Sequence, residues 1–235
     1  MKEERYFYTP DVASGVLPDE EAQHAVRVLR LTAGSEVMLM DGQGTFFRAH
    51  LTDVGKRACA FAVDETLPQE RAWAGRLHLG IAPTKNADRM EWMVEKAVEI
   101  GVDEITFLDC AFSERHHLNL QRLERIVVSA MKQSRKAWKT VLNPLVRFDD
   151  FLKKTTEQQR FICHCYEGER PMLSRQLAKG TSALTLIGPE GDFSLQEVKA
   201  AEAAGFEGVS LDRSRLRTET AGLVAVMMMH QANEL

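Results

Sequence analysis

The sequence predicts an α/β protein in which a mainly parallel sheet is preceded by a smaller, β-rich domain. From about residue 77 onward, short apolar runs alternate with helical patterns, which is typical of a parallel sheet covered on both faces. Residues 1–67 contain mostly strand-like runs instead, and a chain of 235 residues has room for two modest domains. A break in the pattern places the linker at about 67–76, so we expect domains at 1–70 and 74–235.

The first domain is expected to form a small barrel or sandwich. A helical stretch begins at Asp19-Glu20-Glu21, and the strand-like run 36–40 follows it. Asp41-Gly42 then marks a hairpin turn, with further strands at 46–51 and 58–63. Short strands at this spacing are typical of small β-barrels and sandwiches.

In the second domain, recognisable residues mark the ends of the predicted helices. Gly101 stops the first helix, Asn119 is a plausible N-cap for the second, and Ser194-Leu195-Gln196-Glu197 has the capping-box pattern. The last helix, 219–231, is apolar almost all round, so it must be buried in the core or against a second copy. The expected strands of this domain cover 77–82, 105–108, 161–165, 184–187 and 208–211.

Composition excludes several classes of protein. Apolar residues make up 44% and charged residues 27%, which does not fit a disordered chain, and no apolar run approaches the roughly 18 residues of a membrane span. The acidic residues at the N-terminus do not fit a signal peptide, and four scattered cysteines favour a reducing cytoplasm. His116-His117 and Cys163-His164-Cys165 lack the spacing of zinc ligands, so we expect no metal.

A net charge of −4 has the wrong sign for a nucleic-acid-binding protein, but it conceals a basic segment. Between residues 113 and 140, seven Lys and Arg face two Glu, a local balance of +5. Trp138 lies within this segment and could stack on a base, although a solvated helix face is the alternative interpretation. Arg27, Arg30 and Arg48 of the first domain are weaker candidates for contacts with RNA.

Three loops follow predicted strands, at the end of a parallel sheet where ligands bind. They cover residues 165–168, 188–192 and 212–217. In the second loop, glycines bracket Pro189-Glu190; its acidic residues would repel phosphate but suit hydroxyls, amines or a cationic ligand such as S-adenosylmethionine. A tight strand-to-helix turn is the alternative. The third loop carries Arg213, Arg215 and Arg217, which indicates either a solvated loop or a contact with an anion or RNA.

The second and third of these loops resemble the signature motifs of the bacterial RsmE family, the 16S ribosomal RNA uracil-N3 methyltransferases of the SPOUT superfamily. The resemblance begins with Ile187-Gly188-Pro189-Glu190-Gly191 and the stretch 211–221, which reads L-D-R-S-R-L-R-T-E-T-A. It extends essentially along the full chain. Further matches are Arg27-Val28-Leu29-Arg30, the helix within 85–101, and Gln133-Ser134.

The resemblance implies an α/β domain with a C-terminal trefoil knot, preceded by a PUA-like β-barrel that binds RNA. It also implies S-adenosylmethionine as cofactor, a homodimer, and N3 methylation of a specific uridine in 16S ribosomal RNA of the small subunit. The residues implied in binding the cofactor are Cys165, Glu167, Ile187, Gly188, Pro189, Glu190, Gly191, Leu211, Asp212, Ser214, Leu216, Arg217, Thr218 and Ala221. The residues implied in binding RNA are Arg27, Arg30, Lys132, Gln133, Ser134, Arg135 and Lys136.

Two residues are candidates for catalysis. Removing the N3 proton of uracil needs a base or a cation that stabilises the anion, and the Arg217 guanidinium is the first candidate for the cation. Glu190 could act as a base, bind the cofactor or orient Arg217.

The chain departs from the family pattern where Asp192 and Asp212 replace glycines and where Arg135-Lys136 replaces glycine-arginine. Aspartate raises the steric cost of a positive φ at such positions. These departures motivate an alternative, a ribosome-assembly protein that binds RNA without catalysis. A methyltransferase acting on a different RNA position is a third interpretation.

Overall fold

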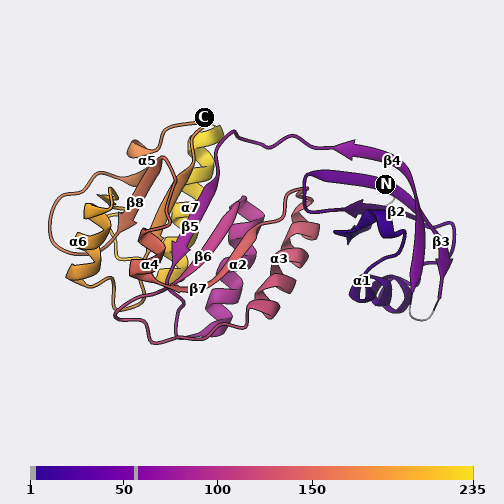
Figure 1. The fold of residues 1–235 in the computed structure, drawn as a ribbon, viewed down its shortest axis with the longest axis horizontal. Helices are drawn as coiled ribbons and strands as arrows, with labels where there is room; N and C mark the ends of the chain where they lie inside the picture. The colour runs from indigo at the N-terminus through magenta and orange to yellow at the C-terminus, as the bar shows by residue number, and fades with distance from the viewer. Residues whose placement is uncertain (1–3, 56–57, 235) are drawn as a thin grey trace. The chain divides into compact units, whose positions relative to one another are not determined.

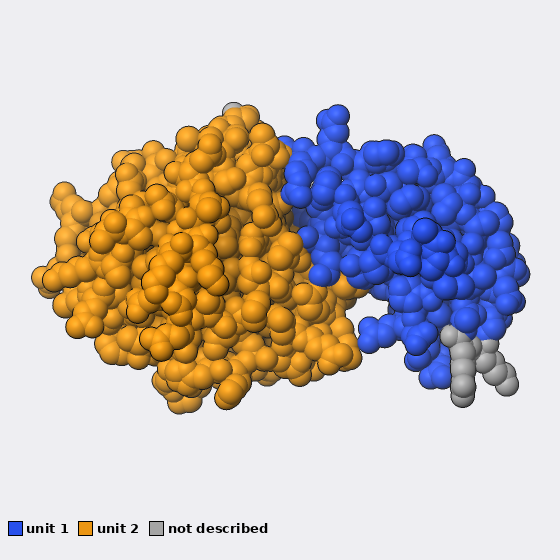
Figure 2. Space-filling view, in the orientation of Figure 1, with its two compact units in different colours: residues 1–72, 131–139 blue, residues 73–130, 140–235 orange. Residues whose placement is uncertain are grey.

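The computed structural model describes residues 4–55 and 58–234, which form two compact units. Unit 1 comprises Met1–Ala72 and Met131–Lys139, and unit 2 comprises Trp73–Ala130 and Thr140–Leu235 (Figure 2). Residues 131–139 thus belong to unit 1, although they follow residues 73–130 of unit 2 in the chain. The sequence patterns did not predict this feature.

Within its described residues, unit 1 contains a four-stranded sheet in the order β1-β2-β3-β4 (Figure 1). β1 (Tyr6–Tyr8) runs parallel to β2 (Glu36–Met40), whereas β2, β3 (Thr45–Val54) and β4 (Cys59–Pro68) are antiparallel. The predicted hairpin at Asp41-Gly42 is confirmed, because the Asp41 Oδ1 atom accepts hydrogen bonds from the N–H groups of Gln43 and Thr45.

The helical stretch of unit 1 begins at Asp19 as predicted, but it is less regular than an α-helix. A 3₁₀ turn, η1 (Val12–Ser14), precedes α1 (Asp19–Gln23), which continues as a π-helical turn, η2 (His24–Val28). Ala22 and Ala25 of this stretch pack with Phe7, Leu39 and Leu51 of the sheet in one buried cluster.

The described part of unit 2 contains a six-stranded parallel sheet in the order β10-β8-β9-β5-β6-β7. Its strands are β5 (Leu77–Ile81), β6 (Glu104–Asp109), β7 (Val141–Arg147), β8 (Gln159–Cys163), β9 (Ala183–Ile187) and β10 (Glu207–Val209). Its helices are α2 (Ala87–Ile100), α3 (Leu120–Ser134), whose last residues belong to unit 1, α4 (Phe148–Leu152), α5 (Leu173–Gln176), α6 (Leu195–Ala203) and α7 (Thr218–Glu234). The prediction of a mainly parallel sheet covered by helices is therefore confirmed.

Helices cover both faces of this sheet (Figure 1). Leu184 and Leu186 of β9 pack with residues of α4 and α6, including Phe151 and Val198. Thr185, which points to the opposite face, donates to the sulfur of Met229 on α7 at 3.4 Å. This alternation of neighbouring side chains is the pattern of a strand buried on both faces.

The predicted helix signals are confirmed. Asn119 Oδ1 accepts from the Arg122 N–H at 3.0 Å, Ser194 and Glu197 form a capping box, and Gly101 ends α2 with a φ of 126°. The last helix is only partly buried, because Met229 is inaccessible whereas Met227 on the opposite side is 39% exposed.

Candidate functional site

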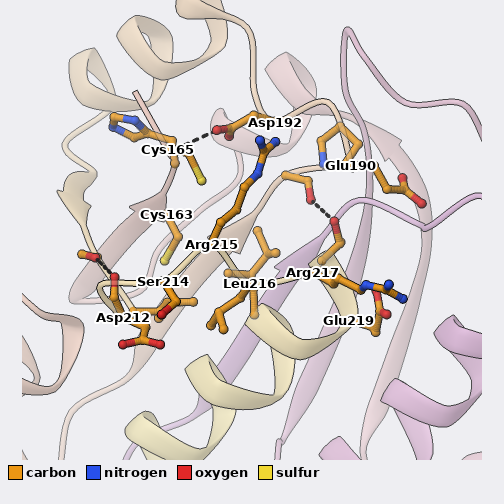
Figure 3. Close-up of a pocket in the computed structure, with 18 of the residues that line it drawn as sticks. Cys163, Cys165, Glu190, Asp192, Asp212, Ser214, Arg215, Leu216, Arg217 and Glu219 are labelled. Atoms are coloured by element: carbon orange, nitrogen blue, oxygen red, sulfur yellow. Dashed lines mark hydrogen bonds between the residues drawn. The ribbon is translucent and has the colours of Figure 1, made fainter. Parts of the chain in front are cut away.

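A cavity of about 440 Å³ lies beyond the carboxyl ends of β8, β9 and β10 (Figure 3). The three loops that follow these strands line it, together with Arg89 of α2 and the first turn of α7. A volume of this size falls within the range of small-molecule sites, and the carboxyl end of a parallel sheet is where such sites occur.

The loop between β9 and α6 is tightly folded. Asp192 N–H donates to the Pro189 carbonyl oxygen at 2.9 Å, and a Cβ atom at Gly188 would lie 3.0 Å from the backbone nitrogen of Phe193. A side chain at Gly188 would therefore press against the backbone of Asp192 and Phe193, which explains the glycine at this position.

Asp192 joins this loop to the loop that follows β8. Its carboxylate accepts from the Cys165 N–H at 2.7 Å (Figure 3). It also accepts from the Phe193 N–H at 2.8 Å. The Tyr166 hydroxyl adds a second connection by donating to the Phe193 carbonyl oxygen at 2.7 Å. Of the two glycine positions occupied by aspartate, only Asp192 has a positive φ, at 69°, so the predicted steric cost does not apply to Asp212.

The loop between β10 and α7 contributes most of the arginines near the cavity. Arg215 and Arg217 line it, whereas Arg213 does not. In Figure 3 the side chain of Arg215 points toward Asp192, and Arg217 lies near Glu219. The Thr218 hydroxyl donates to the Gly188 carbonyl oxygen at 3.2 Å and connects the first turn of α7 to the β9 loop.

Two carboxylates at the cavity have partners within the protein. Glu190 is exposed, and its Oε1 atom accepts from the Lys85 N–H at 2.9 Å. Glu219 is buried and lies 3.6 Å from the guanidinium of Arg89. Glu190 therefore fixes the β5–α2 loop against the β9–α6 loop, and the Glu219–Arg89 pair places a cation from α2 at the cavity.

The thiol and imidazole groups at the end of β8 are not reactive ions at neutral pH. Burial, followed by the nearby Asp192 carboxylate, raises the pKa of the Cys165 thiol, which therefore stays protonated. Burial also lowers the pKa of His164, with the Arg170 charge acting in the same direction, so this ring is neutral.

The structure brings together most of the residues predicted to bind the cofactor. All of them except Glu167 and Gly191 line the cavity, including both catalytic candidates, Glu190 and Arg217. Sequence reasoning did not assign Arg89, Arg215 and Glu219 to the site. The arginine-rich loop did signal Arg215, whereas nothing in the local pattern of α2 marks Arg89. The cavity is also lined by Cys163, His164, Asp192, Val209 and Ser210.

The residues predicted to bind RNA lie in unit 1, and they differ in their surroundings. Arg27, Arg30 and Gln133 are exposed. Lys132 forms an ion pair with the buried Glu21 at 2.6 Å.

The remaining predicted RNA contacts follow Lys132 in the chain. The exposed Arg135 has a φ of 53° and its guanidinium lies 5.5 Å from the Tyr6 ring centroid. Ser134 donates to the Met131 carbonyl oxygen at 3.5 Å, and Lys136 is half-buried.

The basic segment 113–140 is less available than its charge suggested. The Arg122 guanidinium binds both carboxylate oxygens of Glu91, and Arg115 donates to the Thr84 carbonyl oxygen at 3.0 Å. Trp138 is half-buried, with the Arg71 guanidinium 4.0 Å from its ring centroid and Gly44 against the ring. The interpretation of Trp138 as a base-stacking residue is therefore not supported, because its ring is already packed within unit 1.

Residues 4–55 and 58–234 contain no cluster of three or more side chains that could hold a metal ion. In the same residues, no helix combines the length and apolarity needed to span a membrane.

The fold and the cavity define a class of protein: an α/β unit with a ligand-sized site at the carboxyl ends of a parallel sheet, combined with a small β-rich unit. Comparison with known proteins identifies the family. Residues 71–230 match the family described as RNA methyltransferase domain, and residues 17–64 match the RNA methyltransferase PUA domain.

Solved structures agree with this match over nearly the whole chain. A probable rRNA-methyltransferase from Porphyromonas gingivalis is 44% identical, with a TM-score of 0.92 and 98% of each chain covered. A ribosomal RNA small subunit methyltransferase E from Neisseria gonorrhoeae, solved with S-adenosyl methionine, is 27% identical, with a TM-score of 0.85 and the same coverage.

A curated relative supports the same family assignment. The ribosomal RNA small subunit methyltransferase E of Rickettsia conorii is 26% identical over 88% of this chain and 85% of its own length. The chain therefore belongs to the RNA methyltransferase family, and the predicted resemblance to RsmE is confirmed.

Proposed function

We propose that this protein transfers a methyl group from S-adenosylmethionine to N3 of a specific uridine in 16S ribosomal RNA, in the small subunit or an assembly intermediate. The observation that carries the proposal is the cavity beyond β8, β9 and β10, because the residues of the family motifs converge on it. Relatives from Neisseria gonorrhoeae and Legionella pneumophila, 27% and 26% identical, were solved with this cofactor.

The residues at the cavity fit the cofactor. Ile187, Leu211 and Leu216 offer apolar surface, and the carboxylates of Glu190 and Asp212 suit a ligand that carries positive charge. When bound, S-adenosylmethionine supplies an electrophilic methyl group on a sulfonium. The loops that hold it are those joined by Asp192, Thr218 and Lys85.

The protein has to manage the proton on N3 of the uracil, whose pKa lies well above neutrality. We assign Arg217 to stabilise the uracil anion that forms as this proton leaves, because its guanidinium lines the cavity and is exposed to an incoming substrate. Glu190 uses Oε1 to hold the Lys85 N–H, which favours a positioning role for this carboxylate over proton transfer.

The protein is proposed to act in the cytoplasm as a homodimer without a metal. α7 supports the dimer, because Leu223, Val224 and Met228 are only half-buried and Met227 is exposed along one side of it. The C-terminal trefoil knot belongs to the same proposal and rests on the family resemblance.

The alternative, an inactive RNA-binding assembly protein, is less well supported. It was motivated by aspartates in place of two family glycines. Asp192 compensates for its positive φ with two hydrogen bonds, and Asp212 has no positive φ. Neither substitution therefore argues for loss of the site.

Primer extension on small-subunit RNA from cells with and without the gene tests the proposal. A methyl group on N3 blocks Watson–Crick pairing, so reverse transcription should stop at one uridine only when the gene is present. Calorimetry with S-adenosylmethionine accompanies it. Heat of binding without a stop would favour a different RNA position, and no binding at high micromolar cofactor would favour the inactive alternative.

A further inference from the structure

Phe112 is an aromatic residue whose exposure the fold does not explain. It lies in the loop between β6 and α3, at the carboxyl end of the sheet, and 51% of it is accessible to solvent. Phenylalanine is usually buried, and aromatic side chains are enriched on binding surfaces.

The backbone around Phe112 is held firmly although its ring is not buried. Cys110 N–H donates to the Ser113 hydroxyl at 3.0 Å, and Ser113 N–H donates to the Cys110 carbonyl oxygen at 3.0 Å. Ala111 N–H donates to Glu197 of the α6 capping box at 2.8 Å. The exposed ring of Phe112 is therefore carried by a turn, residues 110–113, whose backbone is held by hydrogen bonds.

Phe112 does not line the cavity, but it lies next to the β9–α6 loop, which forms one of its walls. A Cβ atom added to Gly191 would lie 3.0 Å from the Phe112 Cβ, and Gly191 stands between Glu190 and Asp192, which both line the cavity. The φ of Gly191 is not positive, so close approach to Phe112 explains the glycine there. This contact also gives a role to a motif glycine that does not itself line the cavity.

The neighbouring cavity carries positive charge. Arg89, Arg215 and Arg217 line the same cavity, and guanidinium groups are well suited to bind phosphate and the carbonyl oxygens of a base. A basic site with an aromatic side chain on an adjoining loop is a combination that binds an unpaired nucleotide. The arginines make this region a poor match for an apolar protein surface.

We propose that Phe112 is the platform on which the target uracil stacks when it is extruded from the RNA. The inference rests on the proposed function, because N3 lies on the pairing edge of uracil and can be methylated only when the base is unpaired. Stacking on a side chain beside the cavity would hold the extruded base while N3 faces the site. Phe112 is thus a positioning residue for the RNA, with no role in binding the cofactor.

Three substitutions at this position test the proposal with small ribosomal subunits from cells lacking the gene as substrate. Phe112→Ala and Phe112→Leu should lower kcat/KM for the RNA about tenfold, since both remove the stacking face. Phe112→Tyr should stay within about threefold of the unaltered protein, because it retains the ring. The Kd for S-adenosylmethionine should change less than about twofold in all three.

Val141→Ala is the matched control, because Val141 is 44% exposed and starts β7 at the opposite, amino end of the sheet. Full activity of Phe112→Leu would overturn the stacking role, as would a parallel loss of cofactor binding in Phe112→Ala. If the unaltered protein leaves the subunits unmethylated, the proposed function fails instead, so the two failures are distinguishable.

Discussion

At the scale of single residues, Asp192 shows how an unfavourable backbone is retained for the sake of a side chain. A φ of 69° favours glycine, and an L-residue there costs about 1 kcal/mol. The Asp192 carboxylate offsets this cost with hydrogen bonds to Cys165 and Phe193, which connect two of the three loops around the cavity. We therefore expect Asp192 to shape the cofactor site.

Substituting Asp192 separates its two effects. Asp192→Ala keeps the strained backbone and loses both hydrogen bonds, so the Kd for S-adenosylmethionine should rise about tenfold and stability should fall by about 1–2 kcal/mol. Asp192→Gly should recover about 1 kcal/mol of stability but bind the cofactor as weakly as the alanine variant. Calorimetry and urea unfolding measure the two quantities. Normal affinity in Asp192→Gly would show that only the backbone conformation matters.

Arg217 is expected to act in the methyl-transfer step itself. Arg217→Ala should lower kcat about 100-fold or more by removing charge that stabilises the uracil anion, while the melting temperature stays unchanged. Arg213→Ala is the control, because Arg213 is exposed in the same loop but does not line the cavity. Near-normal turnover by Arg217→Ala in single-turnover assays would remove this residue from the mechanism.

At the scale of elements, the β2–β3 hairpin depends on a partner from far along the chain. Gly44 N–H donates to the Ala137 carbonyl oxygen at 3.0 Å, and Lys139 N–H donates to the Gly42 carbonyl oxygen at 3.0 Å. The Trp138 ring occupies the space that a side chain at Gly44 would fill. The segment 131–139 is therefore a structural part of unit 1.

Substitutions at two glycines with positive φ distinguish the effect of packing against Trp138 from the effect of backbone strain. Gly44→Ala should destabilise the protein by about 2–4 kcal/mol, because a methyl group would overlap the Trp138 ring in addition to straining the backbone. Gly34→Ala has a comparable φ of 83° but nothing within 4 Å, so its cost should be about 1 kcal/mol. Equal losses in urea unfolding would mean that Trp138 adds no constraint.

Local patterns predicted the central strands and the helix ends, but they did not predict β1, β7 or α4. β7 contains Pro144, which ordinarily argues against a strand, and it is tolerated because β7 lies at the edge of the sheet. The register of β6 and β7 shifts between Thr106 and Leu108, close to that proline. Edge position is a property of the assembled sheet, so the sequence alone could not reveal it.

At the scale of the whole molecule, dependence on tertiary packing also explains why the sequence did not reveal every residue of the site. Motif residues on consecutive loops could be assigned because parallel strands end at the same side of a sheet. Arg89 reaches the cavity from α2, where it pairs with Glu219 of α7, and that contact depends on tertiary packing. Conversely, Lys132 and Arg122 were predicted as part of a basic surface, but Glu21 and Glu91 partly neutralise them.

The exposed side of α7 leads to a prediction about assembly. Met227→Glu should weaken the proposed homodimer at least about tenfold, because a carboxylate would be buried in an apolar interface. Sedimentation velocity across a concentration series measures the change, with Val141→Glu, on the edge strand β7, as the exposed control. An unchanged sedimentation coefficient in Met227→Glu would place the interface elsewhere.

We also expect the charge pairing of the folded chain to determine which cations bind RNA. Each cation that neutralises a phosphate steepens the fall of affinity with salt, so Arg27→Gln and Arg30→Gln should each reduce the slope of log K against log[salt] by about 1. Arg48→Gln should change it less, because Arg48 already pairs with Glu65 at 2.6 Å.

Lys132→Glu should instead destabilise unit 1 by about 1–3 kcal/mol, since the buried Glu21 would lose its partner and face a like charge. Filter binding of small-subunit RNA between about 50 and 200 mM salt, with unfolding measured in parallel, distinguishes cations that contact RNA from cations that stabilise unit 1. If Arg48→Gln lowered the slope as much as Arg27→Gln, ion pairing within the protein would not govern which cations contact the RNA. The net charge of −4 counts paired and exposed groups alike. It therefore does not indicate RNA binding until the cations paired within the protein are distinguished from the exposed ones.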